Sequence, residues 1–146
     1  MRWGGEDGTN TTVSSVECLD LLTGEWSVVA PLSTDRYRHG VAVAGGKMYA
    51  VGGMDGTDTT VSSVECFNPS TGQWSVVAAM NTARCGHAVA VVAGKIYAVG
   101  GSEDANTYLS SVECFDPLTG VWSIMAGGMS TARAYFGGVA MKCPAE

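Results

Sequence analysis

Hydrophobic residues along the chain occur in short groups separated by glycine-rich or polar turns, a pattern that predicts β-strands. Residues 40–44 read Gly-Val-Ala-Val-Ala, small and apolar on both faces, as expected of an inner strand buried between neighbouring sheets. A glycine turn at 45–46 leads to a second predicted strand over 47–53. A polar loop over 54–60 then leads to a third predicted strand over 63–67.

A fourth strand completes this unit. Residues 68–72 read Asn-Pro-Ser-Thr-Gly, in which proline presets φ and glycine accepts a positive φ, so they predict a turn. The following segment, 73–77, alternates polar and apolar residues with a period of two. Four short antiparallel strands in sequence order are typical of one blade of a β-propeller.

The same unit recurs along the chain at a spacing of 48 residues. Only the last unit departs from this register, because the stretch from Trp122 to Arg133 is one residue longer than that from Trp74 to Arg84. Such regularity indicates a repeat architecture. The repeated positions are the glycine doublets at 4–5, 52–53 and 100–101, Val-Glu-Cys at 16–18, 64–66 and 112–114, and the tryptophans Trp26, Trp74 and Trp122.

These signatures resemble the kelch repeat of the kelch-like protein family. The matching segments of the central unit are Tyr-Ala-Val-Gly-Gly (49–53), Ser-Val-Glu-Cys-Phe-Asn-Pro (63–69), Gly-Gln-Trp (72–74) and Met-Asn-Thr-Ala-Arg (80–84). The resemblance implies a β-propeller with a protein-binding face, which in that family often selects substrates for a cullin-based ubiquitin ligase. The family's cullin contact belongs to BTB and BACK domains, which these residues do not include, so we expect a role in that pathway only with a BTB-containing partner. Because some kelch proteins attach to actin, cytoskeletal binding is the alternative.

The predicted fold is all-β: a single kelch-repeat domain over 1–146 that forms a partial propeller of about three blades. It comprises strands two to four of a first blade, two full blades and one closing inner strand, at about 1–30, 37–78, 85–126 and 134–142. Propellers usually have four to eight blades. Either the chain is a shortened or incomplete family member, or two copies form a homodimer in which each last strand completes the partner's first blade, giving a six-bladed ring.

Composition narrows the expected partners. Hydrophobic residues make up 46% and charged residues 15%, which argues against disorder. A formal charge of −6 argues against a nucleic-acid surface, which requires clustered basic residues. No stretch is long and apolar enough for a membrane span, and the first residues lack the apolar core of a signal peptide. We therefore expect a cytoplasmic protein that binds neither nucleic acid nor membrane.

Loops that leave the second strand and loops that enter the first strand should emerge on one face of the blades. On this face, position 38 and its equivalents vary as Arg38, Gly86 and Tyr135, and variation between near-identical repeats is typical of recognition. The family resemblance implies that this position, and the one after each glycine doublet, face the ligand. Arg38 suits a carboxylate, and the tyrosines offer aromatic anchors; the alternative is that all are solvated loop residues. The predicted ligand-facing residues are Arg38, Tyr37, His39, Tyr135, Tyr108, Glu6, Met54 and Ser102.

Residues that obey the repeat are predicted to be structural. The repeated arginines should pair with the repeated glutamates Glu17, Glu65 and Glu113, and the tryptophans should wedge between adjacent blades. The repeated cysteines Cys18, Cys66 and Cys114 should be buried as small apolar residues. The predicted structural set is Gly52, Gly53, Gly100, Gly101, Trp26, Trp74, Trp122, Arg36, Arg84 and Arg133.

Catalytic and metal chemistry have little support in the sequence. No Cys-x-x-Cys pair suggests zinc, the acidic segments 55–58 and 103–104 lack the spacing of a calcium loop, and no cofactor is expected. The histidines His39 and His87 follow the repeat spacing, and there is no nucleophile elbow, so an enzyme is the least favoured class. Cys85 lies beside Arg84 in a loop, where a positive neighbour would favour a reactive thiol.

Overall fold

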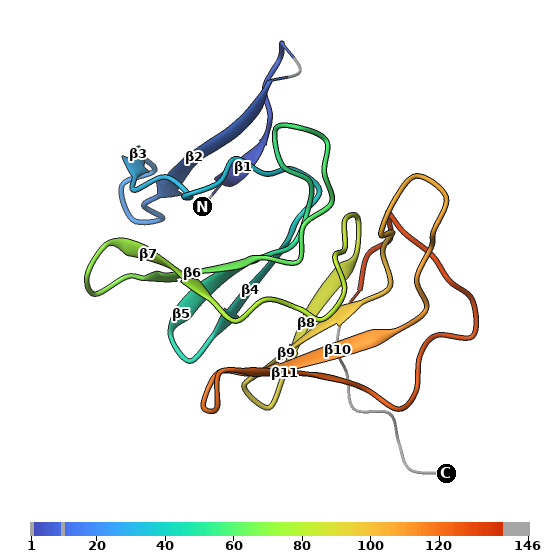
Figure 1. Cartoon of the computed structure of the whole chain (residues 1–146). Coiled ribbons are helices and arrows are strands. Elements are labelled where there is room, and N and C mark those ends of the chain that lie inside the picture. Colours follow the sequence, from blue (N-terminus) through green and yellow to red (C-terminus); the bar gives the residue numbers. More distant parts are fainter. Residues whose placement is uncertain (1, 10, 139–146) are drawn as a thin grey trace.

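The computed structural model describes residues 2–9 and 11–138, and these residues form three antiparallel β-sheets without a helix (Figure 1). The first sheet contains β1 (Arg2–Glu6), β2 (Thr12–Leu19) and β3 (Trp26–Val29). The second contains β4 (Gly40–Ala44), β5 (Lys47–Val51), β6 (Val64–Asn68) and β7 (Gln73–Val77). The third contains β8 (Ala88–Val92), β9 (Lys95–Val99), β10 (Val112–Asp116) and β11 (Val121–Ile124). The all-β prediction is confirmed.

The strands of each sheet follow sequence order, each one antiparallel to the next. The predicted third strand, 63–67, is found one residue later, and the predicted second strand ends at Val51 because the glycine doublet adopts positive φ. The described part of the predicted closing strand, 134–138, is not in a strand, and the rest of it lies outside the described residues. The blade boundaries given above stay a prediction.

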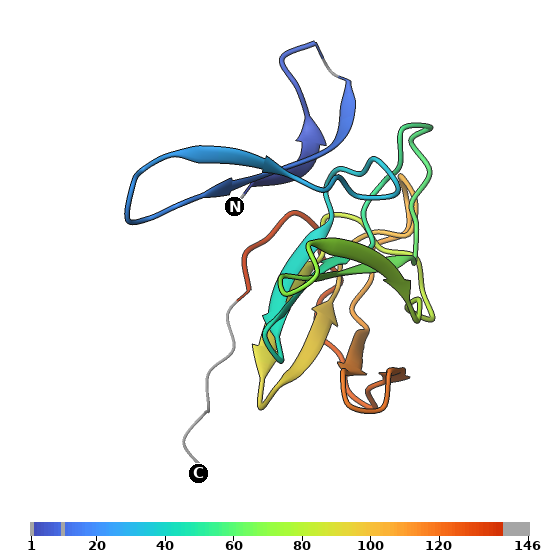
Figure 2. The same cartoon turned by 90° about the vertical axis from the view of Figure 1, so that its left-hand side faces the viewer.

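The second sheet lies between the other two, and Figure 2 shows the first sheet projecting to one side of them. Tryptophans join neighbouring sheets: the indole N–H of Trp74 donates to the carbonyl of Ala30 (2.8 Å), and that of Trp122 donates to the carbonyl of Ala78 (2.9 Å). Trp26, at the equivalent position of the first sheet, is 54% exposed, because no described sheet lies on its other side. Trp74 and Trp122 therefore each belong to a junction with the preceding sheet.

The hydrophobic core lies in these junctions. The larger cluster joins the second and third sheets through side chains that include Tyr49, Phe115 and Trp122. A smaller cluster of Val16, Leu32 and Ala50 joins the first sheet to the second. Cys66 and Cys114 are buried and Cys18 is half-buried; all three are free thiols, as expected for small apolar residues.

Buried ion pairs fasten the segment between two sheets to the sheet that follows. Arg36 donates to Glu65 at 2.7 Å, and Arg84 donates to Glu113 at 3.0 Å, with all four side chains almost fully buried. Arg84 also donates to the carbonyls of Gly100 (2.9 Å) and Ser111 (3.0 Å), so its charge is surrounded by acceptors. These two pairs are those expected from the repeat spacing.

The carboxylates of Glu65 and Glu113 also accept hydrogen bonds from residues other than the arginines. Glu65 accepts bonds from the backbone and hydroxyl of Ser33, both at 2.7 Å. Burial raises the pKa of Glu65, but the bonds from Ser33 and Arg36 outweigh it and leave that pKa below its usual value. The same balance, with bonds from Asn81 and Arg84, lowers the pKa of Glu113.

The glycine doublets are required because the arginine-bearing segment crosses them closely. The amide of Gly53 donates to the carbonyl of Arg84 at 2.8 Å. Gly52 has φ +57°, and a Cβ built on it would lie 2.6 Å from that carbonyl oxygen. A side chain at this position would collide with the backbone that carries the ion pair.

Candidate functional site: a cleft on the loop face

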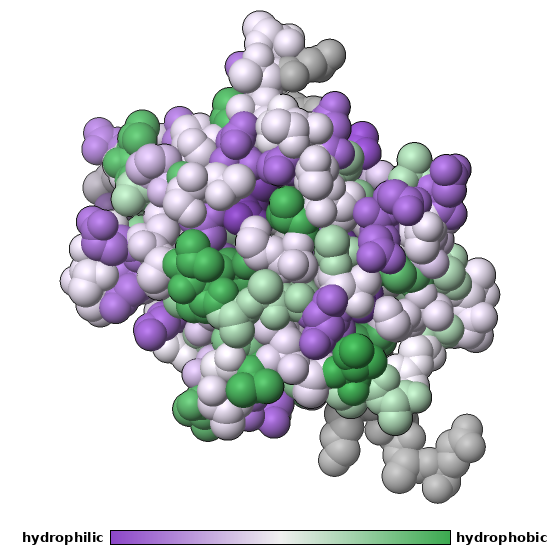
Figure 3. Space-filling view, in the orientation of Figure 1, coloured by the Kyte–Doolittle hydropathy of each residue, from purple (hydrophilic) through white to green (hydrophobic). Residues whose placement is uncertain are grey.

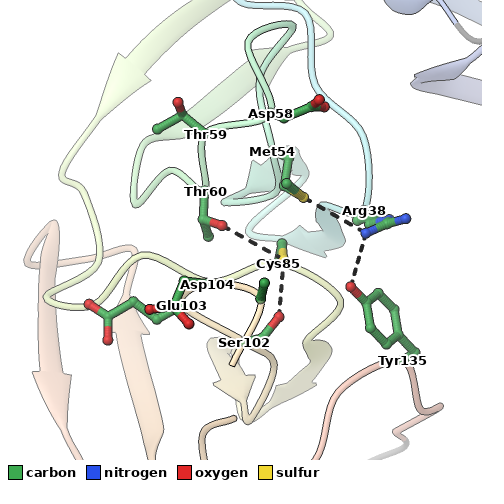
Figure 4. A pocket seen from close by; sticks show the side chains of 11 residues that line it. Arg38, Met54, Asp58, Thr59, Thr60, Cys85, Ser102, Glu103, Asp104 and Tyr135 are labelled. Carbon is green, nitrogen blue, oxygen red and sulfur yellow. Dashed lines mark hydrogen bonds between the residues drawn. The ribbon is translucent and has the colours of Figure 1, made fainter. Parts of the chain in front are cut away.

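A cleft of about 590 Å³ opens between loops of the second and third sheets (Figure 4). It contains four of the residues predicted to face a ligand, Arg38, Met54, Ser102 and Tyr135, together with Cys85. The remaining lining residues are Asp58, Thr59, Thr60, Glu103, Asp104 and Ala105. We call this feature the loop-face cleft.

Backbone pairing holds the loops of this face in place. Tyr37 and Met54 exchange two backbone hydrogen bonds (2.9 and 2.8 Å), and Cys85 and Ser102 exchange two at 2.9 Å. Each pair joins the segment that enters a sheet to the residue that follows the glycine doublet. The partners in each pair lie 17 positions apart and belong to the same repeat, so each sheet builds its own part of the face.

A backbone ladder connects the equivalent positions 38, 86 and 135. The amide of Gly86 donates to the carbonyl of Arg38 (2.9 Å), and the amide of Tyr135 donates to the carbonyl of Gly86 (2.7 Å). All three residues have left-handed backbone, with φ of +54°, +58° and +57°. Glycine adopts this conformation freely, whereas arginine and tyrosine adopt it at a cost, and such strain is concentrated at functional sites.

Arg38 is positioned by two tyrosines. Its guanidinium donates to the Tyr135 hydroxyl at 3.0 Å and lies 5.2 Å from the ring centres of both Tyr135 and Tyr37. It also contacts the sulfur of Met54 at 3.9 Å. Arg38 remains exposed, so these contacts orient its charge without removing it from solvent.

The opposite end of the cleft is acidic (Figure 4). Asp104 accepts backbone bonds from Asn106 (2.8 Å) and Thr107 (2.7 Å), and these bonds lower its pKa. The exposed Glu103 lies beside it. The cleft therefore presents Arg38 at one end and Glu103 and Asp104 at the other, and its lining also includes the carboxylate of Asp58 and several hydroxyl groups.

Cys85 lies between the two ends. Its side chain is 3% exposed, and its sulfur lies 3.3 Å from the Ser102 hydroxyl and 3.9 Å from the Thr60 hydroxyl. The guanidinium of Arg84 is directed to Glu113 and not to this thiol. The reactivity of Cys85 stays a prediction.

The other predicted ligand-facing residues lie outside the cleft. Tyr37 is buried, and its hydroxyl donates to Asp58 at 2.5 Å. Its ring thereby stays in place under the guanidinium of Arg38. Tyr108 is 52% exposed on the loop that continues from Ser102. The side chain of Glu6 lies outside the described residues, although its backbone ends β1.

The two histidines are packed between sheets. Burial lowers the pKa of His87 to about 3, with a further contribution from Arg84, and burial with Arg36 lowers the pKa of His39 to about 4. Neither ring nitrogen of His87 has a hydrogen-bond partner. Both histidines are therefore neutral at pH 7, and His39 lies beside Gly53; its predicted role in facing a ligand stays a prediction.

Residues 2–9 and 11–138 contain neither a metal-ligand cluster nor a membrane-spanning helix. Over 2–9 and 11–138, no group of three or more His, Cys, Asp or Glu side chains could hold a metal ion. No helix capable of crossing a bilayer occurs in this part of the chain.

Sequence reasoning missed the cleft residues Asp58, Thr59 and Thr60. They lie within the loop predicted over 54–60, but nothing in the repeat distinguishes them. Their place in the cleft depends on how the second and third sheets pack together. The side of the molecule to which these loops project is mainly hydrophilic, whereas hydrophobic patches lie over the lower part of the view (Figure 3).

The buried pairs Arg36–Glu65 and Arg84–Glu113 form what we call the arginine–glutamate layer. Together with the repeated sheets and the varied loops of the cleft, this layer defines a β-propeller repeat protein. A family model described as the KLHDC2/KLHL20/DRC7 Kelch-repeats domain matches residues 1–142, so the chain belongs to the kelch-repeat family. The prediction of kelch-type blades is confirmed.

Individual relatives agree with this assignment. The chain is 46% identical over 43 residues to Kelch-like ECH-associated protein 1A of Danio rerio, a match that covers 30% of this chain and 7% of that protein. The solved structure of YjhT superposes with a TM-score of 0.76 at 18% identity, over 89% of this chain and 49% of that one. The chain thus spans about half of the length of YjhT, and this likeness shows the fold alone.

Proposed function

We propose that the chain is a protein-interaction module that binds an extended segment of a partner protein in the loop-face cleft. The observation that carries this proposal is the left-handed backbone of Arg38 and Tyr135 at a position where the equivalent residue of the intervening repeat is Gly86. A scaffold position that glycine satisfies without strain gains nothing structural from a large side chain there. These two side chains are instead presented, in contact with each other, at the rim of the cleft.

The chemistry of the cleft supports a polar ligand of mixed charge. Arg38 can donate a bidentate pair of hydrogen bonds to a carboxylate or to backbone carbonyls. Glu103 and Asp104 can accept from a basic side chain at the other end, and the tyrosine rings provide apolar contact area. Arginine and tyrosine are also the residue types that most often dominate binding energy in protein interfaces.

A finer role follows from the kelch-like resemblance alone. The chain would select substrates for a cullin-based ubiquitin ligase, and it would do so only together with a BTB-containing partner. Copurification of a cullin with the chain, dependent on such a partner, would support this role.

The experiment is a peptide-display selection on the immobilised chain, followed by titration of a selected peptide against variants. Arg38→Ala combined with Tyr135→Ala should weaken binding by about 30-fold or more, as expected for loss of two central anchors. Lys47→Ala, at the turn between β4 and β5 and thus at the other end of the strands, is the matched control and should leave the affinity unchanged. Equal affinity of the double variant and the wild type would overturn the proposal.

Actin binding is the alternative raised by the sequence. Co-sedimentation of the chain with filaments would support it, and sensitivity of that binding to the same double variant would place it in the loop-face cleft.

A further inference from the structure

We propose that two copies of this chain assemble into a closed ring of six sheets, in which Arg133 of each copy enters a site beside Glu17 of the other. Arg36 and Arg84 are each held by one sheet and point their side chains to the next. The backbone of Arg36 is held by the first sheet, through the amide of Gly5, and its side chain reaches the second. The backbone of Arg84 is held by the second sheet, through Gly53, and its side chain reaches the third.

The backbone of Arg133 is held by its own sheet, as the backbones of Arg36 and Arg84 are. The amide of Gly101 donates to its carbonyl at 2.9 Å, and its own amide donates to the carbonyl of Leu109 at 3.2 Å. Its backbone carbonyl is therefore held by the second glycine of a doublet, as those of Arg36 and Arg84 are. Its side chain is exposed, however, and its one described bond runs to the carbonyl of Thr131.

The first sheet contains the residues equivalent to those that accept the arginine side chain in the other sheets. The side chain of Arg36 bonds to Gly52, Ser63 and Glu65 of the second sheet, and the equivalent residues of the first sheet are Gly4, Ser15 and Glu17. These three residues line a cavity of about 150 Å³, together with Asp7 and Val13. The cavity thus lies where the two complete junctions hold a guanidinium, and its carboxylates complement the charge of Arg133.

The tryptophans give an independent observation on the same two surfaces. Trp74 and Trp122 each donate to an alanine carbonyl of the preceding sheet, at Ala30 and Ala78. The next alanine at this spacing is Ala126, which is exposed beside β11, and the tryptophan that would match it is the exposed Trp26. Packing the third sheet of one copy against the first sheet of another would form both contacts at once.

The number of copies follows from geometry. The interface joins two different surfaces, so it must close into a ring or continue as a filament. The described residues of one copy supply three sheets, and closed propellers typically contain four to eight. Two copies give six sheets, whereas three copies would give nine, so a two-fold dimer is the closed assembly that fits.

The first experiment is light scattering of the purified chain over a concentration series. We expect a particle of twice the chain mass that dissociates on dilution. A folded particle of single-chain mass at all concentrations would overturn the proposal, and so would an open-ended series of larger species.

The second experiment separates this interface from any other dimer. Removing one partner of a buried ion pair commonly costs enough to weaken association by about 100-fold or more, so Glu17→Ala and Arg133→Ala should each give monomers. Trp26→Phe, which keeps an aromatic ring but removes the indole N–H and part of the ring area, should weaken the dimer by about 10-fold. Lys95→Ala removes a cation of the third sheet that pairs with Asp116 at 3.0 Å, and should leave dimerisation unchanged.

Mixing the two alanine variants provides the strictest test. In a mixed dimer one junction keeps both Glu17 and Arg133 and the other lacks both, so no buried charge is left unpaired. We expect equimolar mixing to restore dimers that neither variant forms alone. Dimers that persist in both single variants, or monomers in the mixture despite native circular dichroism, would overturn the proposal. Arg2→Ala is included because Arg2 lies opposite Glu17 in the β1–β2 register, and it should leave the dimer intact.

Discussion

Arg36 and Arg38 are two residues apart, yet they belong to regions of the molecule with opposite properties. Arg36 is fully buried in the arginine–glutamate layer, with its charge paired by Glu65. Arg38 is exposed at the loop-face cleft, on left-handed backbone, between two tyrosines. The layer uses the same residues in successive repeats because each junction poses the same packing problem, whereas the cleft uses different ones. The buried, repeated arginine therefore stabilises the scaffold, whereas the non-repeated one is available for recognition.

The largest expected effect is on the layer itself. Glu113→Ala should lower the free energy of unfolding by about 3–5 kcal/mol, because it leaves Arg84 buried without its partner. Denaturant unfolding followed by circular dichroism measures this. Lys95→Ala, which breaks the exposed pair with Asp116, is the control and should change stability little. Equal losses in the two variants would mean that the layer does not hold the sheets together.

Acid should act on the same region. Since burial lowers the pKa of His87 to about 3, from about 6.5 in the unfolded chain, the neutral imidazole contributes stability that is fully present above pH 6.5. This contribution is lost as the pH falls through the folded pKa, at no more than about 1.4 kcal/mol per pH unit. The lowered pKa values of Glu65 and Glu113 add a loss of the same sign below about pH 4.5. Unfolding curves between pH 7.5 and 4 should show stability that falls toward acid, and a flat profile would contradict the neutral, buried state of His87.

A smaller effect is expected at the glycine doublet. Gly52→Ala should cost roughly 2–3 kcal/mol, since it adds backbone strain at φ +57° and a Cβ 2.6 Å from the carbonyl of Arg84. Gly72→Ala is the matched control, with a similar φ of +66° but open space around the Cβ, and should cost only about 1–2 kcal/mol. The difference between the two free energies of unfolding isolates the close approach of the backbone, and no difference would argue that this approach is unimportant.

The smallest effect on stability is expected in the cleft. Arg38→Gly and Tyr135→Gly remove strained backbone and exposed side chains, so the free energy of unfolding should stay within about 1 kcal/mol of wild type or rise slightly. Ligand binding should fall in both. A loss of several kcal/mol in either variant would place these residues in the scaffold and erase the contrast with Arg84.

The sequence predicted the scaffold well because each repeat encodes it locally. Strand patterns, the glycine doublet and the spacing of Arg84 and Glu113 all follow from residues within one unit. It also placed Arg38, Met54, Ser102 and Tyr135 on a common face, because the direction of alternating strands determines where loops emerge. The contacts of the cleft depend instead on how neighbouring sheets pack.

Three features could not be read from the repeat. The left-handed backbone at Arg38 and Tyr135 was hidden because only Gly86 has a residue type that signals positive φ. Tyr37 proved buried because its ring lies beneath Arg38, which sequence spacing does not specify. The exposure of Trp26 and Arg133 reflects the lack of a described sheet beside them, a property of the arrangement of sheets and not of either residue.

The measurement that tests the central claim most directly is hydrogen-exchange mass spectrometry of the chain with and without a selected peptide. If recognition uses the loop-face cleft, bound peptide should protect backbone amides within 33–39, 54–60 and 102–108. The turns at the other end of the strands, at 45–46, 68–72 and 116–120, should exchange at unchanged rates. Protection confined to those turns, with the loop face unaffected, would contradict the account.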